Sequence, residues 1–399
     1  MERKFKLLAV ASALTVIGVP SAQAVDFFGY FRTGPAKCSE AGVNRCQFSL
    51  SGAGAGAYYR LGNELDTYSE FGFSQAGKAD AVDYKATMMI NGYNPGSNAA
   101  TGTQFGFNQV YAEGKGFDIA PSANFWIGQR FYGRADVHIV DTFYTKLDGT
   151  GAGVEVPVGG GTLATAFFRD DASVGSRVNV DFSGLTVNPG GKLRVLGSFT
   201  SSDLKVAGTK VGKSGVGLTV QHNQDNIFGL GGGNTAWVQY AQGSTGLDGN
   251  FGTATAPSST KAFRFVESLT WQVGPLGGQA QAMYTDSKVA VAATTVATKT
   301  MSIGGRVSYA LTKNFKLVAD TGYSEAKTDG LAKEKLAKFT FAPTLSTGPG
   351  FWNRPELRVF VTTAKWNSAA NTYAGSGGLG GLGTKTTGTG YGFQAEMWF

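Results

Sequence analysis

The chain has 399 residues, of which 59 are glycine and 16% are charged. Glycine is about twice as frequent as the usual ~7% and charged residues fall below the usual ~25%, a composition that favours strands and turns over helices. Without its first 24 residues the chain keeps 32 of its 35 basic and 27 of its 28 acidic residues, a net charge of +5. No basic block concentrates this charge, which argues against a nucleic-acid partner.

Residues 1–24 have the pattern of a secretory signal peptide. Basic residues at positions 3, 4 and 6 precede the apolar run Leu7–Val19, and the small-residue sequence Ser21–Ala24 follows. This apolar run is shorter than the ~20 residues that a membrane-spanning helix needs, so cleavage before Val25 is favoured over an anchor. We expect residues 25–399 to form a single transmembrane domain, because no internal repeat or linker divides them.

Two segments near the N-terminus alternate apolar and polar residues, as strands with one apolar face do. They are Val25–Arg32 and Thr67–Phe73. In the first, Tyr30 and Arg32 share a face with Phe28, opposite Phe27 and Phe31. In the second, Tyr68 and Glu70 lie opposite Phe71 and Phe73.

The only two cysteines, Cys38 and Cys46, lie between these segments. They are eight residues apart in a chain expected to be exported, so we predict a disulfide that closes a small loop. A metal site is not expected, because neither His138 nor His222 is near them and no second cysteine pair exists. The two histidines are expected to pack in loops or in the lumen rather than to do chemistry.

Alternating runs continue along the chain. We count about 18 such segments over 375 residues, roughly 21 residues per strand and connection, as a closed all-β barrel requires. The further runs are Lys85–Asn91, Asn108–Gly114, Asn124–Arg130, Thr162–Arg169, Arg177–Phe182, Lys192–Thr200, Gly215–His222, Ala236–Gln242, Ala262–Val273, Gln279–Tyr284, Met301–Leu311, Phe315–Tyr323, Ala337–Leu345 and Arg354–Lys365.

The last nine residues, Tyr391–Phe399, have apolar residues at every odd position. A terminal aromatic residue that closes such a strand is typical of outer-membrane barrels, where it lies in the interfacial girdle. If the odd positions face lipid, Trp398, Glu396 and Gln394 face the lumen. The Trp398 indole then either packs against a loop or offers a stacking surface to sugar rings. This strand alone leaves the two alternatives open.

Five separated blocks resemble the maltoporin family, in the same order and at both ends and the middle of the chain. They are Val25–Tyr30, Tyr59–Glu64, Arg130–His138, Trp352–Phe360 and Glu396–Phe399. The resemblance implies a homotrimer of 18-stranded antiparallel barrels in the outer membrane of a Gram-negative bacterium, each with an inward-folded third loop. It also implies cofactor-free passive diffusion of maltose, maltodextrins or related oligosaccharides along a strip of lumen aromatics, the aromatic slide.

The resemblance also assigns residues to the pore. By position the slide consists of Tyr30, Tyr68, Trp352 and Trp398, on which the apolar faces of sugar rings pack. A polar track beside it exchanges hydrogen bonds with sugar hydroxyls. Salt bridging within the barrel is the alternative role for its members, which are Arg32, Arg60 and Glu70, with Arg134, Asp136 and Asp141 on the inward loop.

Several positions depart from the family pattern. At the constriction, Phe143 stands where the family has a tyrosine, and Lys146 where it has an acidic residue. Asn108 aligns with an arginine, and Leu218 with an aromatic slide residue. No Trp lies in 91–104, where the family's second loop lends an indole to the adjacent subunit, and Tyr93 is a weak substitute.

These departures leave the sugar open, since sucrose-type relatives share the fold and the slide. A general diffusion porin for small hydrophilic solutes is the main alternative function. A strand-rich adhesion protein is opposed by the terminal Phe399. Enzymatic activity is not expected, because the sequence offers no nucleophile with a base beside it.

Overall fold

The computed structural model describes residues 24–40, 46–50, 59–95, 102–291, 294–373 and 378–399. The predicted signal peptide lies outside the described residues, apart from Ala24. No helix among the described residues is long and apolar enough to cross a membrane.

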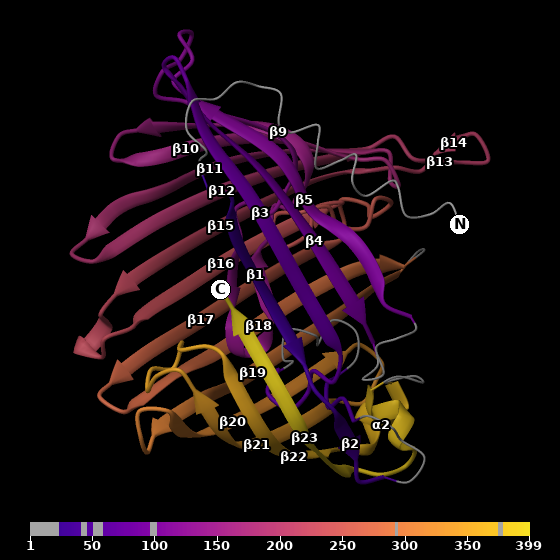
Figure 1. Ribbon diagram of the computed structural model, residues 1–399. Coiled ribbons are helices and arrows are strands. Elements are labelled where there is room, and N and C mark those ends of the chain that lie inside the picture. Colours follow the sequence, from indigo (N-terminus) through magenta and orange to yellow (C-terminus); the bar gives the residue numbers. More distant parts are fainter. Residues whose placement is uncertain (1–23, 41–45, 51–58, 96–101, 292–293, 374–377) are drawn as a thin grey trace, which may run out of the picture.

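The predicted all-β fold is confirmed as a closed antiparallel barrel of 18 strands (Figure 1). Its sheet contains 19 strand segments, because β2 continues β1 along the same edge of β23. In chain order they are β1 (Asp26–Thr33), β2 (Ala36–Cys38), β3 (Thr67–Ala79), β4 (Val82–Asn94), β5 (Gln104–Lys115), β6 (Asn124–Arg130), β9 (Gly149–Val158), β10 (Gly161–Asp170), β11 (Gly175–Asn188), β12 (Gly191–Ser202), β15 (Ser214–Asp225), β16 (Gly233–Gly243), β17 (Lys261–Val273), β18 (Leu276–Val291), β19 (Thr294–Ala310), β20 (Phe315–Thr328), β21 (Glu334–Ser346), β22 (Glu356–Trp366) and β23 (Thr387–Trp398).

Closure joins the two ends of the chain. β1 pairs with β3 on one side and with β23 on the other, where Tyr30 lies opposite Trp398. Closing the sheet in this way leaves no unpaired edge within the barrel. Every barrel strand except β9 contains one of the predicted alternating runs.

The side chains alternate between lumen and lipid as the period-two patterns predict. On β22, for example, Glu356 and Arg358 are buried inside, whereas Leu357 and Val359 are exposed outside. The terminal strand follows the predicted parity, with Gln394 and Glu396 buried and Phe393 exposed.

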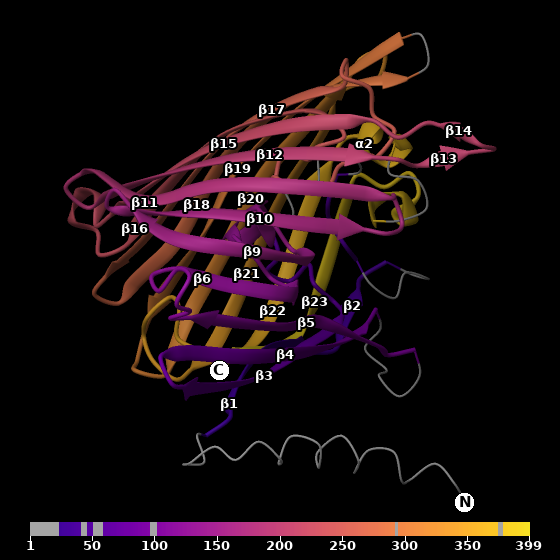
Figure 2. The ribbon, with the colours of Figure 1, turned by 90° about the horizontal axis from the view of Figure 1, so that it is seen from above.

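The connections differ between the two ends of the barrel. Two-residue turns such as 80–81, 159–160 and 274–275 lie at one end of the barrel, together with the beginning of β1 and the end of β23. We call this the short-turn end. The opposite, long-loop end carries the connections 34–66, 203–213, 244–260 and 367–386. Its hairpin β13 (Lys205–Val206) and β14 (Thr209–Lys210) projects beyond the barrel (Figure 2).

The third loop, residues 131–148, which we call L3, folds into the lumen. It forms β7 (Ala135–Val137), the short helix η2 (His138–Val140) and β8 (Thr142–Thr145). Its apolar residues pack on Trp237, Val266 and Met283 of β16 to β18. The Tyr144 hydroxyl donates to Gln281 Oε1 at 2.8 Å, which fixes L3 against this wall.

Residues 59–62, near the end of the connection 34–66 that we call L1, also lie in the lumen. The ring of Tyr59 covers the two glycines that face each other across β19 and β20, Gly304 and Gly322. Lys338 donates to the carbonyls of Tyr59 and Leu61. L1 and L3 therefore occupy the side of the lumen along β16–β22.

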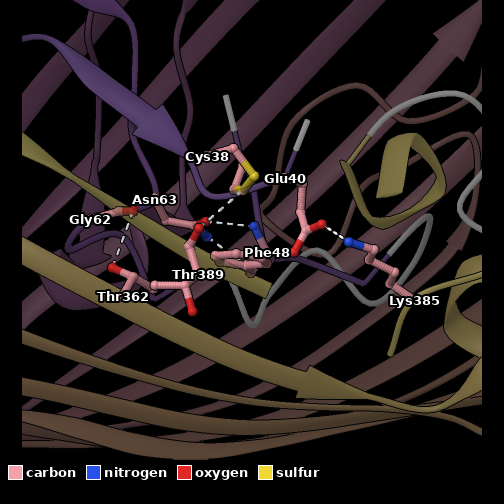
Figure 3. Close-up of a disulfide and its surroundings, with 9 residues drawn as sticks. Cys38, Glu40, Phe48, Gly62, Asn63, Thr362, Lys385 and Thr389 are labelled. Carbon is pink, nitrogen blue, oxygen red and sulfur yellow. Dashed lines mark hydrogen bonds and ion pairs between the residues drawn. A yellow bond between two sulfur atoms is a disulfide. The ribbon is translucent and has the colours of Figure 1, made fainter. Parts of the chain in front are cut away.

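The predicted disulfide between Cys38 and Cys46 is present at the base of L1, with a Cα–Cα distance of 5.1 Å (Figure 3). Next to it, the Asn63 side chain bonds both the N–H and the carbonyl of Phe48, at 2.7 and 2.9 Å. Phe48 in turn packs with Trp366 in a buried cluster at the long-loop end. The disulfide thus belongs to a small core that anchors L1 where it enters the barrel.

Candidate functional site

Two adjoining cavities run past L3. The first, of about 660 Å³, is lined by residues of β1, β3, β5 and β6 and by one side of L3. The second, of about 520 Å³, lies toward the short-turn end and is lined by residues of β16 to β18 and by Trp352. They share Asp136, His138 and Trp398, so they are two parts of one passage.

All four predicted slide residues line this passage: Tyr30, Tyr68 and Trp398 in the first cavity, and Trp352 with Trp398 in the second. The ring centroids of Tyr30 and Tyr68 are 6.3 Å apart, and so are those of Trp398 and Trp352. Tyr30 and Trp398 are register partners, which makes the row continuous. Tyr93 extends it toward the long-loop end, with its ring 6.5 Å from that of Tyr68.

The position of Trp352 depends on an unusually long turn at the short-turn end, residues 347–355. Phe351 is buried, and its N–H donates to Gln272 Oε1 of β17 at 2.8 Å. The Phe351 ring contacts Trp352 edge to face, with the centroids 4.8 Å apart. The turn is thereby held inside the barrel mouth and presents Trp352 to the passage.

His138 of L3 lies between the two tryptophans. Its ring is 5.4 Å from Trp352 and 5.5 Å from Trp398, edge to face in both cases. Burial, aided by the positive charge of Arg60, holds the pKa of His138 well below its usual range. The neutral ring therefore acts as a packing partner, in agreement with the role expected from the sequence, but its place inside the slide was not predicted.

Arg354, which sequence reasoning missed, supports the same tryptophans from behind. Its guanidinium carbon is 4.1 Å from the centroid of the Trp398 ring, and its Nη1 donates to the Phe351 carbonyl at 3.0 Å. Carboxylates of Glu356 and Glu396 neutralise it, each at 3.2 Å. The clue in the sequence is its place two residues after Trp352 and just before a strand.

Arg32 and Arg60 of the predicted polar track line the first cavity but are held by carboxylates. Arg32 bonds Asp66 at 2.8 Å and lies 3.3 Å from Glu64, which also pairs with Arg60 at 2.9 Å. Arg60 donates to the Tyr30 hydroxyl at 2.5 Å. Salt bridging, the alternative role considered for these charges, is what the geometry shows, and the same bonds fix the Tyr30 ring.

The three predicted acidic residues of the track also line the passage. Glu70 accepts hydrogen bonds from Tyr68 and from Asn108, at 2.6 and 2.7 Å. Asp141 lies 3.8 Å from Arg60, whereas no basic group of the described residues comes within 4 Å of Asp136. Asp136 lines both cavities and is free to accept hydrogen bonds there.

L3 brings Arg134, together with Phe143 and Lys146, the two residues expected at the constriction, to the wall of the first cavity. The Arg134 guanidinium lies 4.7 Å from the centroid of the Phe143 ring and donates to Asp148 at 2.9 Å. Lys146 Nζ is 4.0 Å from the same carboxylate. Two cations thus share one carboxylate, which leaves one positive charge in excess at this point.

The 244–251 turn holds L3 in place at Lys146 through hydrogen bonds that were not predicted from the sequence. The Lys146 N–H donates to the carbonyl of Asp248 at 3.0 Å, and Asn250 Nδ2 donates to the Lys146 carbonyl at 2.9 Å. The backbone of Lys146 is therefore held on both its N–H and its carbonyl by this single turn, which lies far along the chain.

The alignment of Leu218 with a slide position is wrong. Leu218 is 49% exposed on the outer face of β15, whereas its neighbour Thr219 is buried in the lumen. A residue on the lipid side cannot contribute to the passage, because successive side chains of a strand point to opposite faces. The aliphatic residue there does not shorten the slide.

The chain matches one protein-family model and is similar to several solved structures. The LamB porin family model matches residues 25–399. Similar solved structures include the outer-membrane expressed OmpT of Vibrio cholerae, with a TM-score of 0.45 and 9% identity over 96% of this chain and 100% of that chain. Salmonella typhi OmpF in complex with daunomycin has a TM-score of 0.48 and 13% identity over 94% of this chain and 97% of that chain. A mutant of Rh. blastica porin has a TM-score of 0.42 and 10% identity over 94% of this chain and 100% of that chain.

Proposed function

The chain belongs to the LamB porin family, and we propose that its barrel carries maltose, maltodextrins or related oligosaccharides by facilitated passive diffusion. The family and the closed 18-stranded fold are those of channel proteins of the Gram-negative outer membrane. Selectivity for sugars, and assembly as a homotrimer, are the further steps that we propose.

The continuous row of aromatic rings carries this proposal. Four rings follow one another along the passage, from Tyr68 through Tyr30 and Trp398 to Trp352, and the ring of Tyr93 adjoins that of Tyr68 toward the long-loop end. The apolar face of a pyranose ring packs on such rings, so a sugar chain can move from one ring to the next. Each contact must be weak enough to be replaced, because a channel has to release what it binds.

Polar groups beside the row supply the second half of sugar recognition. Glu70 and Asp136 offer carboxylate oxygens to the passage, and Arg134 and Lys146 offer donors to the first cavity. Hydrogen bonds between such charged groups and sugar hydroxyls are about twice as strong as neutral ones. A channel with this lining distinguishes sugars from ions by binding as well as by size.

Sugar-induced blocking of ion current tests the proposal. The mature protein is inserted into a planar bilayer, and maltotriose, maltohexaose and sucrose are titrated against the parent and against Trp398→Ala. A distributed binding path becomes occupied at high sugar, so we expect saturable blocking by the preferred sugar and a weaker block in the variant.

The outcome separates the two candidate functions. If one of the three sugars blocks the current with saturation, it identifies the substrate class, and sucrose would indicate a sucrose-type porin. A current that none of them changes contradicts selective transport and leaves a general diffusion porin.

A further inference from the structure

Six lysines form a row on the outer face of six adjacent strands, β17 to β22, the orange to yellow strands of Figure 1. Each is exposed and lies at most five residues from the long-loop end of its strand. We call them the lysine row. Its members are Lys261, Lys288, Lys299, Lys327, Lys335 and Lys365.

The lysine row borders the lipid-facing surface of the barrel. On β17, β19 and β21 the next residues on the same face, toward the middle of the barrel, are exposed and apolar. They are Phe263 and Phe265 on β17, Met301 and Ile303 on β19, and Ala337, Phe339 and Phe341 on β21. The lysines therefore lie where the hydrocarbon band ends and lipid headgroups begin, at the end that faces outward when long loops are extracellular.

The register of the strands brings lysines directly opposite one another. Lys261 is the partner of Lys288, and Lys299 is the partner of Lys327. Side chains in such pairs have Cβ atoms about 5 Å apart, and like charges in this arrangement destabilise a sheet. Two such pairs within four strands require a compensating anion.

The protein itself supplies too few carboxylates at this rim. Among the described residues, Asp286 lies 3.9 Å from Lys299, and Glu325 lies 2.8 Å from Lys333. Asp329, in the 329–333 loop, accepts a hydrogen bond from the Ala297 N–H. With Lys333 added to the row, seven cations face three carboxylates, an excess of four positive charges.

We propose that the lysine row binds the phosphate groups of a glycolipid in the outer leaflet of the membrane. A headgroup phosphate can lie between two opposed lysines while the acyl chains pack on the aromatic band below. Lysine suits this role, because its flexible apolar stem lies along the barrel surface and its ammonium reaches the headgroup. A soluble anion would gain the charge contacts but not the adjoining apolar ones.

Binding of lipid A to the purified barrel tests this proposal. The full mature protein is placed in detergent micelles, and bis-phosphorylated lipid A is titrated against the parent and against Lys261→Gln/Lys288→Gln/Lys299→Gln/Lys327→Gln. A lysine near an anionic headgroup contributes about a fivefold change in affinity, so the four substitutions together are expected to weaken binding about 600-fold.

A matched variant and a matched lipid serve as controls. Lys205→Gln/Lys210→Gln removes charge from the β13–β14 hairpin at the same end but away from the lipid-facing band, and should bind like the parent. Dephosphorylated lipid A should bind the parent as weakly as it binds the fourfold variant. Heat-dependent gel mobility establishes that each variant is folded, and if the fourfold variant is not, Lys261→Gln/Lys288→Gln is expected to show about a 25-fold loss.

Three results would overturn the proposal. The first is an affinity of the substituted, folded barrel for bis-phosphorylated lipid A that stays within threefold of the parent. The second is equal binding of phosphorylated and dephosphorylated lipid A by the parent. The third is loss of oligomers in the variant without loss of lipid binding, which would identify the lysine row as a contact between copies of the chain.

Discussion

Replacing Trp352 by alanine is expected to weaken sugar binding about tenfold. The Trp352 side chain is 44% exposed, and a tryptophan presents up to ~250 Å², so about 110 Å² faces the passage. A sugar ring on one face covers roughly half of that area, and at about 25 cal/mol per Å² the lost contact is worth about 1.4 kcal/mol. This free energy corresponds to a factor of about ten in the dissociation constant.

Analysis of the current noise that the sugar induces measures this change, because it gives the binding and release rates separately. We expect the loss mainly in faster release, as is usual for variants of one binding surface. Trp271→Ala is the matched control. Trp271 lies over Gly278 on the lipid-facing side of β17, whereas its neighbour Thr270 lines the passage. Affinity within twofold of the parent in Trp352→Ala, or an equal loss in Trp271→Ala, would refute the reasoning.

Three further outcomes are expected. Lys146→Glu replaces the excess positive charge beside Asp148 by a negative one, so the reversal potential in a salt gradient should shift toward cation selectivity. Lys205→Glu, on the outer hairpin, should leave the reversal potential unchanged. Gly322→Val places a side chain where the Tyr59 ring lies, 2.0 Å from its Cβ position, so L1 must move and the single-channel conductance should change. Asn250→Ala removes a hydrogen bond to the L3 backbone worth about 1 kcal/mol, so the open channel should become noisier at an unchanged melting temperature of the barrel.

Period-two alternation was sufficient to predict the strands and which of their faces forms the lumen. Tyr30, Tyr68 and Trp398 could be assigned to the lumen from parity alone, because a strand that faces lipid on one side must point its other residues inward. The exception is β9, which the alternation did not predict. Four of its first five residues are glycine or alanine, which give no contrast between the two faces, and its register is set by pairing with β6 and β10 instead.

The loops could not be predicted in the same way. Arg60 meets Glu396 only because the barrel closes, and the contact between Asn250 and Lys146 joins segments that are 104 residues apart. Resemblance to a family supplied the roles of Trp352 and the L3 residues, since local sequence pattern carries no information on such distant contacts. Resemblance to the family also placed Leu218 in the slide, although the alternation of its own strand puts this residue on the outer face.

Closure of the barrel by β23 also determines when the passage can come into existence during assembly. Trp398 and Glu396, the residues that join the two cavities and hold Arg60, are among the last four of the chain. A barrel still open between β1 and β23 lacks the continuous row of rings, because Tyr30 and Trp398 become neighbours only when these two strands pair. The row of rings and the closed barrel are therefore completed in the same step.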